Sequence, residues 1–214
     1  MTGYFVTGTD TGVGKTHVTE ALARCARVLG KKVFAFKPIE TGCEHVDGQL
    51  AGSDMEALCK AAGGWQQGEL RGVYRLRNPV APLVAAKAEA IDIDLHRIDE
   101  VLAQGSRQAD VTLVEGAGGW RVPITDKVDM GALAKRIGLP VVIVARATLG
   151  TINHSLLTIE AVEREGCTVA ALVLSRRPEE SRDFALSNCE QVSARWPGRV
   201  LVYEGSDAVL RQLF

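Results

Sequence analysis

The sequence lacks the features that mark several large classes of protein. Its five cysteines are scattered, odd in number and free of C-x-x-C or zinc-finger spacing, which argues against a disulfide framework and a zinc site. The chain does not open with a basic segment followed by an apolar one, and it contains no apolar run near the roughly 20 residues of a membrane span. We therefore expect free thiols in the core of a cytoplasmic protein with no membrane partner.

A strong net charge is also missing. Lys and Arg number 25 and Asp and Glu number 26, so charge offers no reason to expect a nucleic-acid or anionic-membrane partner. No repeat, low-complexity tract or linker divides the chain. We expect residues 1–214 to form a single domain that buries roughly 70% of the surface of its unfolded form.

Short runs rich in β-branched residues alternate with longer helical stretches. The segment 141–144 is apolar at every position, which is typical of a parallel strand covered on both faces. This alternation predicts an α/β fold with a mostly parallel β-sheet flanked by helices on both faces. The predicted strands are 4–7, 32–36, 111–115, 141–145, 169–174 and 200–203, and the predicted helices are 16–29, 54–62, 95–107, 129–137, 152–165 and 181–195. The Gly/Gln-rich segment 63–68 predicts a surface loop.

The strongest motif follows the first predicted strand. Its sequence is Gly8-Thr9-Asp10-Thr11-Gly12-Val13-Gly14-Lys15-Thr16, and it leads into a predicted helix, as a phosphate-binding P-loop requires. The glycines let backbone N–H groups turn toward one concavity, Lys15 reaches the β- and γ-phosphates, and the Thr16 hydroxyl can ligate Mg²⁺. The loop departs from G-x-x-x-x-G-K-[ST], because its first glycine lies one residue early and Thr9 stands in its place.

Two acidic residues are candidates to complete a Mg²⁺ site with Thr16. Glu115 ends an apolar predicted strand, and the carboxyl ends of parallel strands face the crevice where ligands bind. Asp54 stands at a predicted helix start, where it could also be a simple N-cap. Mg²⁺ needs only one or two carboxylates when phosphate oxygens and water supply the rest.

Lys37 ends the second predicted strand, directly before Pro38. A lysine in that position is ordinarily an exposed surface residue. Its place at a strand end nevertheless brings it near the phosphates, and the turn-prone pair Thr41-Gly42 follows. After Glu115, the run Gly116-Ala117-Gly118-Gly119 forms a glycine-rich segment at the same edge of the predicted sheet.

Together these segments resemble the dethiobiotin synthetase family. The resemblance spans residues 4 to about 174 and implies a P-loop NTPase fold. It also implies a homodimeric ligase of biotin biosynthesis, with ATP or another nucleoside triphosphate and Mg²⁺, acting on 7,8-diaminononanoate and CO₂ or bicarbonate. The matching segments are Gly8 to Thr16, Lys37-Pro38, Thr41-Gly42, Ser53-Asp54, Glu115 to Gly119 and Leu149-Gly150-Thr151-Ile152-Asn153-His154.

The resemblance also implies roles for individual residues. A carbamate and then a carbamic–phosphoric anhydride would form beside the catalytic residues Lys37, Lys15 and Thr11. Thr16, Asp54 and Glu115 would hold the metal. The implied nucleotide-binding residues are Gly12, Val13, Gly14, Lys15, Thr16, His17, Asp54, Glu115, Gly116, Ala117, Gly118, Ser175 and Arg176. The implied substrate-binding residues are Thr41, Gly119, Gly150, Thr151, Ile152 and Asn153, the last four at a helix start and across the dimer interface.

The chain departs from this family toward its C-terminus. Ser175-Arg176 stand where the family usually carries an Asn-Asp pair that recognises adenine, and Tyr203-Glu204-Gly205-Ser206 stand near an expected Gly-x-x-Pro segment. A hydroxyl cannot both donate and accept at a base edge as an asparagine amide does, and Arg176 offers donors only. We expect weak discrimination among nucleoside triphosphates, with Arg176 favouring a carbonyl-bearing base if its side chain points into the pocket.

Two other classes share a P-loop of this kind. A partition or division-site ATPase would carry a lysine five residues before Lys15, where this chain has Asp10. Its membrane anchor could correspond to the amphipathic segment 207–214, but a single basic residue there favours a buried terminal helix. Another amide-forming ligase is disfavoured because the chain has no glutaminase-like addition.

Overall fold

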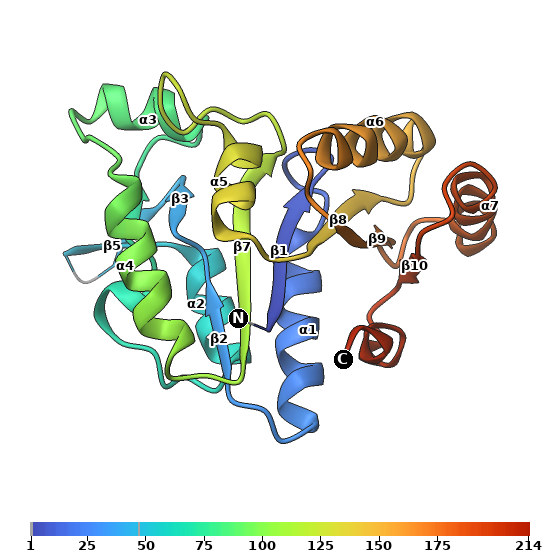
Figure 1. The fold of residues 1–214 in the computed structure, drawn as a ribbon, viewed down its shortest axis with the longest axis horizontal. Helices are drawn as coiled ribbons and strands as arrows, with labels where there is room; N and C mark the ends of the chain where they lie inside the picture. The colour runs from blue at the N-terminus through green and yellow to red at the C-terminus, as the bar shows by residue number, and fades with distance from the viewer. Residues whose placement is uncertain (1, 47) are drawn as a thin grey trace.

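The computed structural model describes residues 2–46 and 48–214, and a six-stranded parallel sheet forms its centre (Figure 1). The strand order is β10-β9-β8-β1-β7-β2, and every neighbouring pair is parallel. The strands are β1 (Gly3–Gly8), β2 (Val33–Phe36), β7 (Val111–Gly119), β8 (Val141–Arg146), β9 (Val169–Ser175) and β10 (Val200–Tyr203). All six predicted strands are therefore confirmed, together with the α/β, P-loop NTPase fold class.

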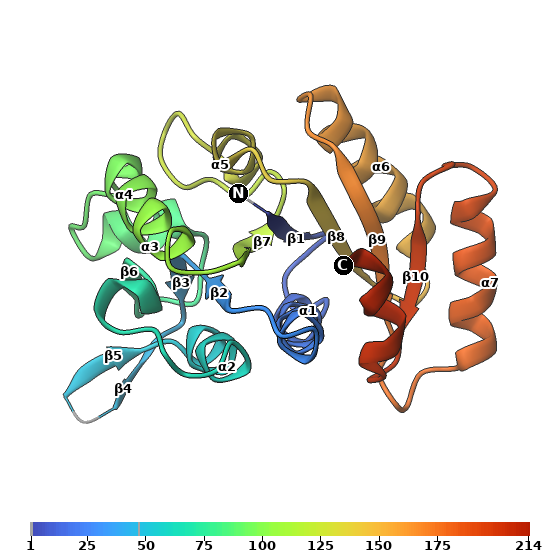
Figure 2. The same ribbon diagram turned by 60° about the horizontal axis from the view of Figure 1, so that its bottom comes forward.

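Helices cover both faces of this sheet (Figure 2). Consecutive strand residues point to opposite layers, so that Phe5 packs under one set of helices and Val6 under the other. The first layer contains α4 (Leu95–Ser106), α5 (Met130–Ile137), α6 (Thr151–Arg164) and α7 (Arg182–Ser193). The second contains α1 (Lys15–Val28), α2 (Ser53–Ala61) and the terminal 3-10 helix η2 (Asp207–Leu213). Burial on both faces explains why the strands are apolar without alternation.

Several short elements between β2 and β7 were not predicted from the sequence. β3 (Ile39–Thr41) pairs in parallel with β6 (Tyr74–Leu76), and β4 (Glu44–Val46) pairs antiparallel with β5 (Gln49–Ala51). The helix α3 (Pro82–Ala88) and the 3-10 turn η1 (Gly68–Arg71) complete this region. Each of these strands is three residues long, too short for alternation to be recognised.

The segment 63–68 is a loop, but it is not simply a surface loop. Gln66 is 2% exposed, and its side-chain amide donates to the Ala35 carbonyl at 2.8 Å and accepts from the Ala35 N–H at 3.3 Å. The Trp65 indole N–H donates to the Val33 carbonyl at 2.7 Å. β2 is the last strand of the sheet, so these side chains occupy backbone groups that would otherwise be open to another strand.

The C-terminal segment packs against α1, as the sequence predicted for a buried terminal helix. Leu210 and Leu213 are buried, and the Arg24 guanidinium pairs with Asp207 at 2.8 Å. The segment is a 3-10 helix rather than an α-helix, and Phe214 stays partly exposed. The five cysteines are unpaired, as expected, with three buried and two half-buried. Within the described ranges no helix has the length and apolar character needed to cross a bilayer.

Candidate active site

The P-loop joins β1 to α1 and is shaped by two glycines. Gly12 and Gly14 have φ values of 72° and 98°, a left-handed conformation that costs other residues strain. Gly14 is also the N-cap of α1 and supplies no side chain to the first turn, which leaves the helix N–H groups available to phosphate. The Thr9 N–H donates to the Val144 carbonyl at 2.9 Å and ties the loop to β8.

Glu115 lies at the centre of the site and is completely buried. Its Oε1 accepts from the Thr16 hydroxyl at 3.0 Å and from the Lys37 ammonium at 2.9 Å. The Thr19 hydroxyl lies 2.8 Å from its Oε2 and 2.9 Å from the Lys15 carbonyl, and can donate to one of these at a time. Sequence reasoning missed Thr19, although it follows Thr16 by one helical turn and therefore shares its face of α1.

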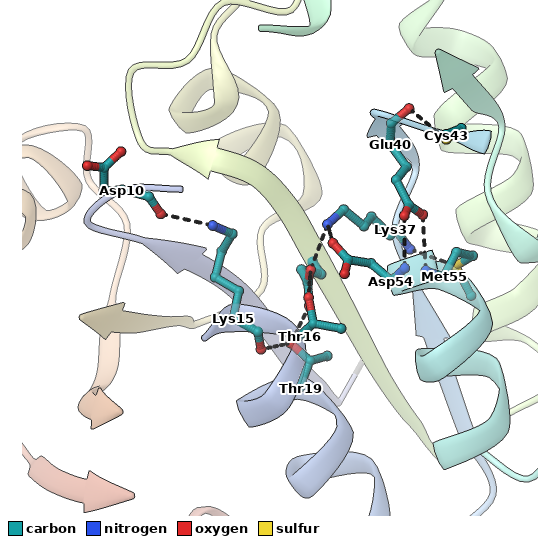
Figure 3. Close-up of polar contacts among 10 residues, drawn as sticks. Asp10, Lys15, Thr16, Thr19, Lys37, Glu40, Cys43, Asp54 and Met55 are labelled. Atoms are coloured by element: carbon teal, nitrogen blue, oxygen red, sulfur yellow. Dashed lines mark hydrogen bonds and ion pairs between the residues drawn. The ribbon is translucent and has the colours of Figure 1, made fainter. Parts of the chain in front are cut away.

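Lys37 is buried, with 5% exposure, which corrects the view of it as an ordinary exposed lysine at a strand end. Its ammonium pairs with Glu115 at 2.9 Å and with Asp54, toward which it points in Figure 3. Burial opposes the charge of Lys37, but the two carboxylates outweigh it and raise the pKa of this lysine above its ordinary value. Burial opposes the charge of Asp54 as well, yet Lys37 and the Thr16 hydroxyl lower the pKa of Asp54. The pair is thus fully ionised at neutral pH.

Lys15 is held differently. Its ammonium donates to the Asp10 carbonyl at 3.0 Å, folded back over the loop rather than paired with a carboxylate (Figure 3). Burial lowers the pKa of Lys15 to about 8, because the nearby Glu115 only partly compensates for desolvation and Lys37 adds repulsion. A phosphate anion in the loop would supply the counter-charge that Lys15 lacks.

The donors around Lys37 fit Mg²⁺ when a nucleotide is present. Thr16, Asp54 and Glu115 bring together one hydroxyl and two carboxylates, the hard oxygen ligands this ion prefers. Asp54 is the second residue of α2 and not its N-cap, so its carboxylate does not cap the helix and points instead toward Lys37 and this donor set. In the described part of the chain no cluster of three or more His, Cys, Asp and Glu side chains could hold a metal unaided. The donor set therefore suits a metal that arrives with phosphate oxygens.

A cleft of about 960 Å³ opens above these residues. One end is formed by residues 11–17 with Lys37, Thr41, Asp54, Ala117 and Gly118, and we call it the phosphate end because the sequence predicts phosphate binding there. The other end is formed by residues 175–179 and 203–205, and we call it the base end because the sequence predicts that the base of the nucleotide lies there. A third wall, formed by residues 79–82 and Val122, was not predicted from the sequence. Glu115 lies beneath the floor, and Gly116, Gly119 and residues 150–153 do not line the cleft.

Comparisons with known proteins agree with this geometry. Residues 2–202 match a family model described as an AAA domain. The ATP-dependent dethiobiotin synthetase BioD of Anaeromyxobacter dehalogenans (strain 2CP-C) is 43% identical over 95% of this chain and 91% of that protein. The protein of that name in Thermodesulfovibrio yellowstonii is 41% identical over 89% and 82%. The chain belongs to the dethiobiotin synthetase family.

Solved structures with low sequence identity share the fold of this family member. The chain superimposes over 100% of its length on 86% of a chain in the MinC:MinD cell division complex of Aquifex aeolicus, with a TM-score of 0.57 and 14% identity. It also matches 65% of the signal recognition particle receptor FtsY of Elizabethkingia anophelis, with a TM-score of 0.53 and 16% identity. At such identities the likeness shows the fold alone.

At the base end this member of the dethiobiotin synthetase family differs from the Asn-Asp pattern expected of the family. The Arg176 guanidinium donates from Nε to Glu204 at 3.0 Å and from Nη1 to the carbonyls of Arg177 and Pro178 at 3.1 and 3.3 Å. These donors therefore brace the turn that follows β9. Ser175 lies against the P-loop, so close that a Cβ added to Gly14 would stand 2.6 Å from the Ser175 hydroxyl. Neither side chain presents the paired donor and acceptor of an asparagine amide.

Proposed function

We propose that this chain is an ATP-dependent dethiobiotin synthetase that uses Mg²⁺ to join CO₂ to 7,8-diaminononanoate and close its ureido ring. The observation that carries the proposal is the ammonium of Lys37, buried between Asp54 and Glu115 and lining the same cleft as Lys15. Carbamate and γ-phosphate are both anions, so bringing them together needs a fixed positive charge between them. A charge held in a water-poor site stabilises such a transition state strongly.

The reaction then runs in three steps. One amine adds to CO₂ and loses a proton, which gives a carbamate. A carbamate oxygen attacks the γ-phosphorus, ADP leaves, and a carbamic–phosphoric anhydride remains. The second amine attacks the carbonyl carbon, loses a proton and expels inorganic phosphate, which closes the ring. Phosphate serves only to activate the carbonyl carbon, so positioning and charge neutralisation account for most of the rate.

Different residues of the phosphate end have different roles in these steps. Lys15 contacts the β- and γ-phosphates, Lys37 spans the γ-phosphate and the carbamate, and Thr11 and Thr41 orient the carbamate and the amine. Thr16, Asp54 and Glu115 would hold Mg²⁺, which would neutralise charge on the phosphate oxygens. The backbone N–H groups from Gly12 to His17 cradle the phosphates.

The tail carboxylate of the substrate is assigned to residues 150–153 of a second copy of the chain. Gly150, with φ of 91°, is the N-cap of α6 and supplies no side-chain oxygen to it. The Thr151 N–H donates to the Thr148 carbonyl at 3.1 Å, so the anion is assigned to the N–H groups of Ile152 and Asn153. These residues lie outside the cleft, and Leu149 and Leu157 beside them are 90% and 57% exposed. A homodimer would cover both and complete the substrate site. The cytoplasmic location, the absence of nucleic-acid and membrane partners and the single domain spanning residues 1–214 stay predictions from the sequence.

The direct test is to incubate the purified protein with diaminononanoate, bicarbonate, Mg²⁺ and ATP and to look for dethiobiotin by mass spectrometry. Product should form only with all four components and should be lost in Lys15→Ala. ATP hydrolysis that ignores diaminononanoate and yields no dethiobiotin would instead place the chain among nucleotide-dependent switches. Formation of a different amide from a larger acid would favour the other ligase class.

A further inference from the structure

The start of α2 carries an unusual helix cap. The other helices that begin with a side-chain cap use their own N-cap residue: Asp94 in α4, Asp129 in α5 and Ser181 in α7. The N-cap of α2 is Gly52, which has the extended backbone typical of a capping residue, with φ of −96° and ψ of 121°, but no side chain to supply an acceptor oxygen.

Glu40 supplies the missing oxygens from a separate segment (Figure 3). Its Oε1 accepts from the Asp54 N–H at 2.8 Å and its Oε2 from the Met55 N–H at 3.0 Å, the second and third N–H groups of α2. These are the two groups that a capping side chain normally serves. Glu40 is 5% exposed, so its carboxylate is committed to the protein rather than to solvent.

The Glu40 carboxylate fills the space that a side chain at position 52 would need. A Cβ built on Gly52 would stand 2.0 Å from the Glu40 Oε2, well inside van der Waals contact. The ordinary solution, a Ser or Asp at the N-cap, is therefore excluded as long as Glu40 is present. The two residues act as a pair in which glycine makes room for a carboxylate that arrives from β3.

We propose that Glu40 is a positioning residue that sets the Asp54 carboxylate for Mg²⁺ and for Lys37 by gripping the Asp54 and Met55 backbone. Three links join Glu40 to the site. It holds the backbone N–H of Asp54 itself, Asp54 pairs with Lys37, and the Met55 sulfur accepts from the Lys37 backbone N–H at 3.2 Å. Loss of the grip lets the first turn of α2 fray, and the Asp54 carboxylate moves with it. The inference rests on the proposed Mg²⁺–nucleotide site.

The test measures binding of a non-hydrolysable ATP analogue by calorimetry, with Mg²⁺ and with EDTA. Glu40→Ala should weaken binding in Mg²⁺ by about tenfold to a hundredfold, as loss of a group that orients a metal ligand usually does. Binding in EDTA should be unchanged, because the P-loop does not touch Glu40. Asp94→Ala, which removes the cap of α4 far along the chain, is the matched control and should lower the melting temperature without moving either affinity.

A second substitution, Gly52→Asp, should change Mg²⁺-dependent binding in opposite directions in the parent and in Glu40→Ala. Gly52→Asp in the parent should weaken Mg²⁺-dependent binding, since the new Cβ meets Glu40. In the Glu40→Ala background the same change should restore binding to within a few-fold of the parent, because the introduced carboxylate would then cap α2 in the ordinary way and keep the negative charge. If Glu40→Ala does not fold, Glu40→Gln replaces it in the affinity measurement with Mg²⁺ and with EDTA, because its amide has one acceptor oxygen for the two N–H groups of α2. Gly52→Asp is then measured in the parent alone, since the glutamine side chain fills the same space as that of Glu40.

The outcomes distinguish the role of Glu40 from the nucleotide site itself. If the parent protein binds no analogue in Mg²⁺, the proposed nucleotide site is wrong, and the role of Glu40 with it. A parent that binds, with Glu40→Ala equal to it in Mg²⁺, overturns the positioning role alone. Failure of Gly52→Asp to rescue the alanine variant also overturns it, since Glu40 would then act by something other than capping.

Discussion

The two ends of the cleft are built in contrasting ways. At the phosphate end Lys37 and Glu115 are buried and bonded to each other, and Glu115 also accepts from the Thr16 hydroxyl and lies 2.8 Å from the Thr19 hydroxyl. At the base end the ion pair of Arg176 with Glu204 stays in contact with solvent, with side chains 16% and 28% exposed, and Arg176 also donates to its own turn. A buried, mutually bonded pair is fixed in place, whereas a pair that keeps contact with solvent is partly screened and contributes less. The phosphate end should therefore determine affinity and chemistry, and the base end should tolerate variation.

The largest effect is expected from Lys37→Ala. Turnover should fall by about 10²-fold or more, because the charge between the two reacting anions is lost. Glu115 would also be left buried without its cation, which should destabilise the fold by about 3 kcal/mol at neutral pH. Single-turnover kinetics and denaturant unfolding measure the two effects. Lys60→Ala on the exposed face of α2 is the control, and a Lys37 variant with near-parent rate would remove this residue from the mechanism.

Glu115→Gln should weaken Mg²⁺-dependent nucleotide binding by about tenfold or more while preserving side-chain size. The amide offers one acceptor where the carboxylate offers two, and one of its hydrogens must face Thr19 or the Thr16–Lys37 pair. Mg²⁺ titrations monitored by nucleotide fluorescence test this, with Glu69→Gln in an exposed ion pair as control. Superimposable titrations of variant and parent would show that Glu115 does not serve the metal.

A smaller effect should appear as pH dependence of nucleotide affinity. The pKa of Lys15 is about 8 in the free protein, and a bound phosphate should raise it by supplying the missing counter-charge. Affinity should thus be constant below about pH 8 and fall by up to about tenfold per pH unit above it, with proton uptake on binding in that range. Calorimetry in buffers of different ionisation enthalpy measures the uptake. Binding without proton exchange at about pH 9 would contradict the lowered pKa.

The smallest effect should come from changing the base of the nucleoside triphosphate. We expect kcat/KM for at least one of CTP, GTP and UTP to lie within roughly tenfold to a hundredfold of that for ATP at one Mg²⁺ concentration. A preference for ATP above about a thousandfold over all three would show that another segment recognises adenine.

Arg176→Ala sharpens the same comparison. Because its guanidinium donates to Glu204 and to the carbonyls of Arg177, Pro178 and Glu180, the variant should lose about 1 kcal/mol of stability while the ratio of kcat/KM for ATP and CTP stays the same. Thermal unfolding and competition assays give the two values. A change in nucleotide ratio larger than the change seen with Arg182→Ala, which also contacts Glu204, would place Arg176 in the base pocket.

The covalent order of residues was sufficient to predict much of this molecule. All six strands of the central sheet and the six long helices lie within a few residues of their expected positions. The P-loop, Lys37, Asp54 and Glu115 were selected from local motifs, and the structure brings them together, with Glu115 beneath the floor of the cleft that the others line. Such signals are local: runs of apolar residues, glycines that permit a left-handed backbone, and polar residues at strand ends.

Only the tertiary structure decided how these residues are used. Lys37 and Glu115 are 78 residues apart and Thr16 and Glu115 are 99 apart, yet their contacts determine that Lys37 is buried and ionised. The capping of α2 by Glu40 and the covering of β2 by Gln66 likewise join separate segments. Burial and pairing depend on which groups the folded chain brings within a few ångströms, whereas periodicity and turn chemistry depend on neighbours along the chain. For this reason the sequence determined the elements and the candidate residues, and the fold determined their charge states, their partners and the cap that holds Asp54 in place.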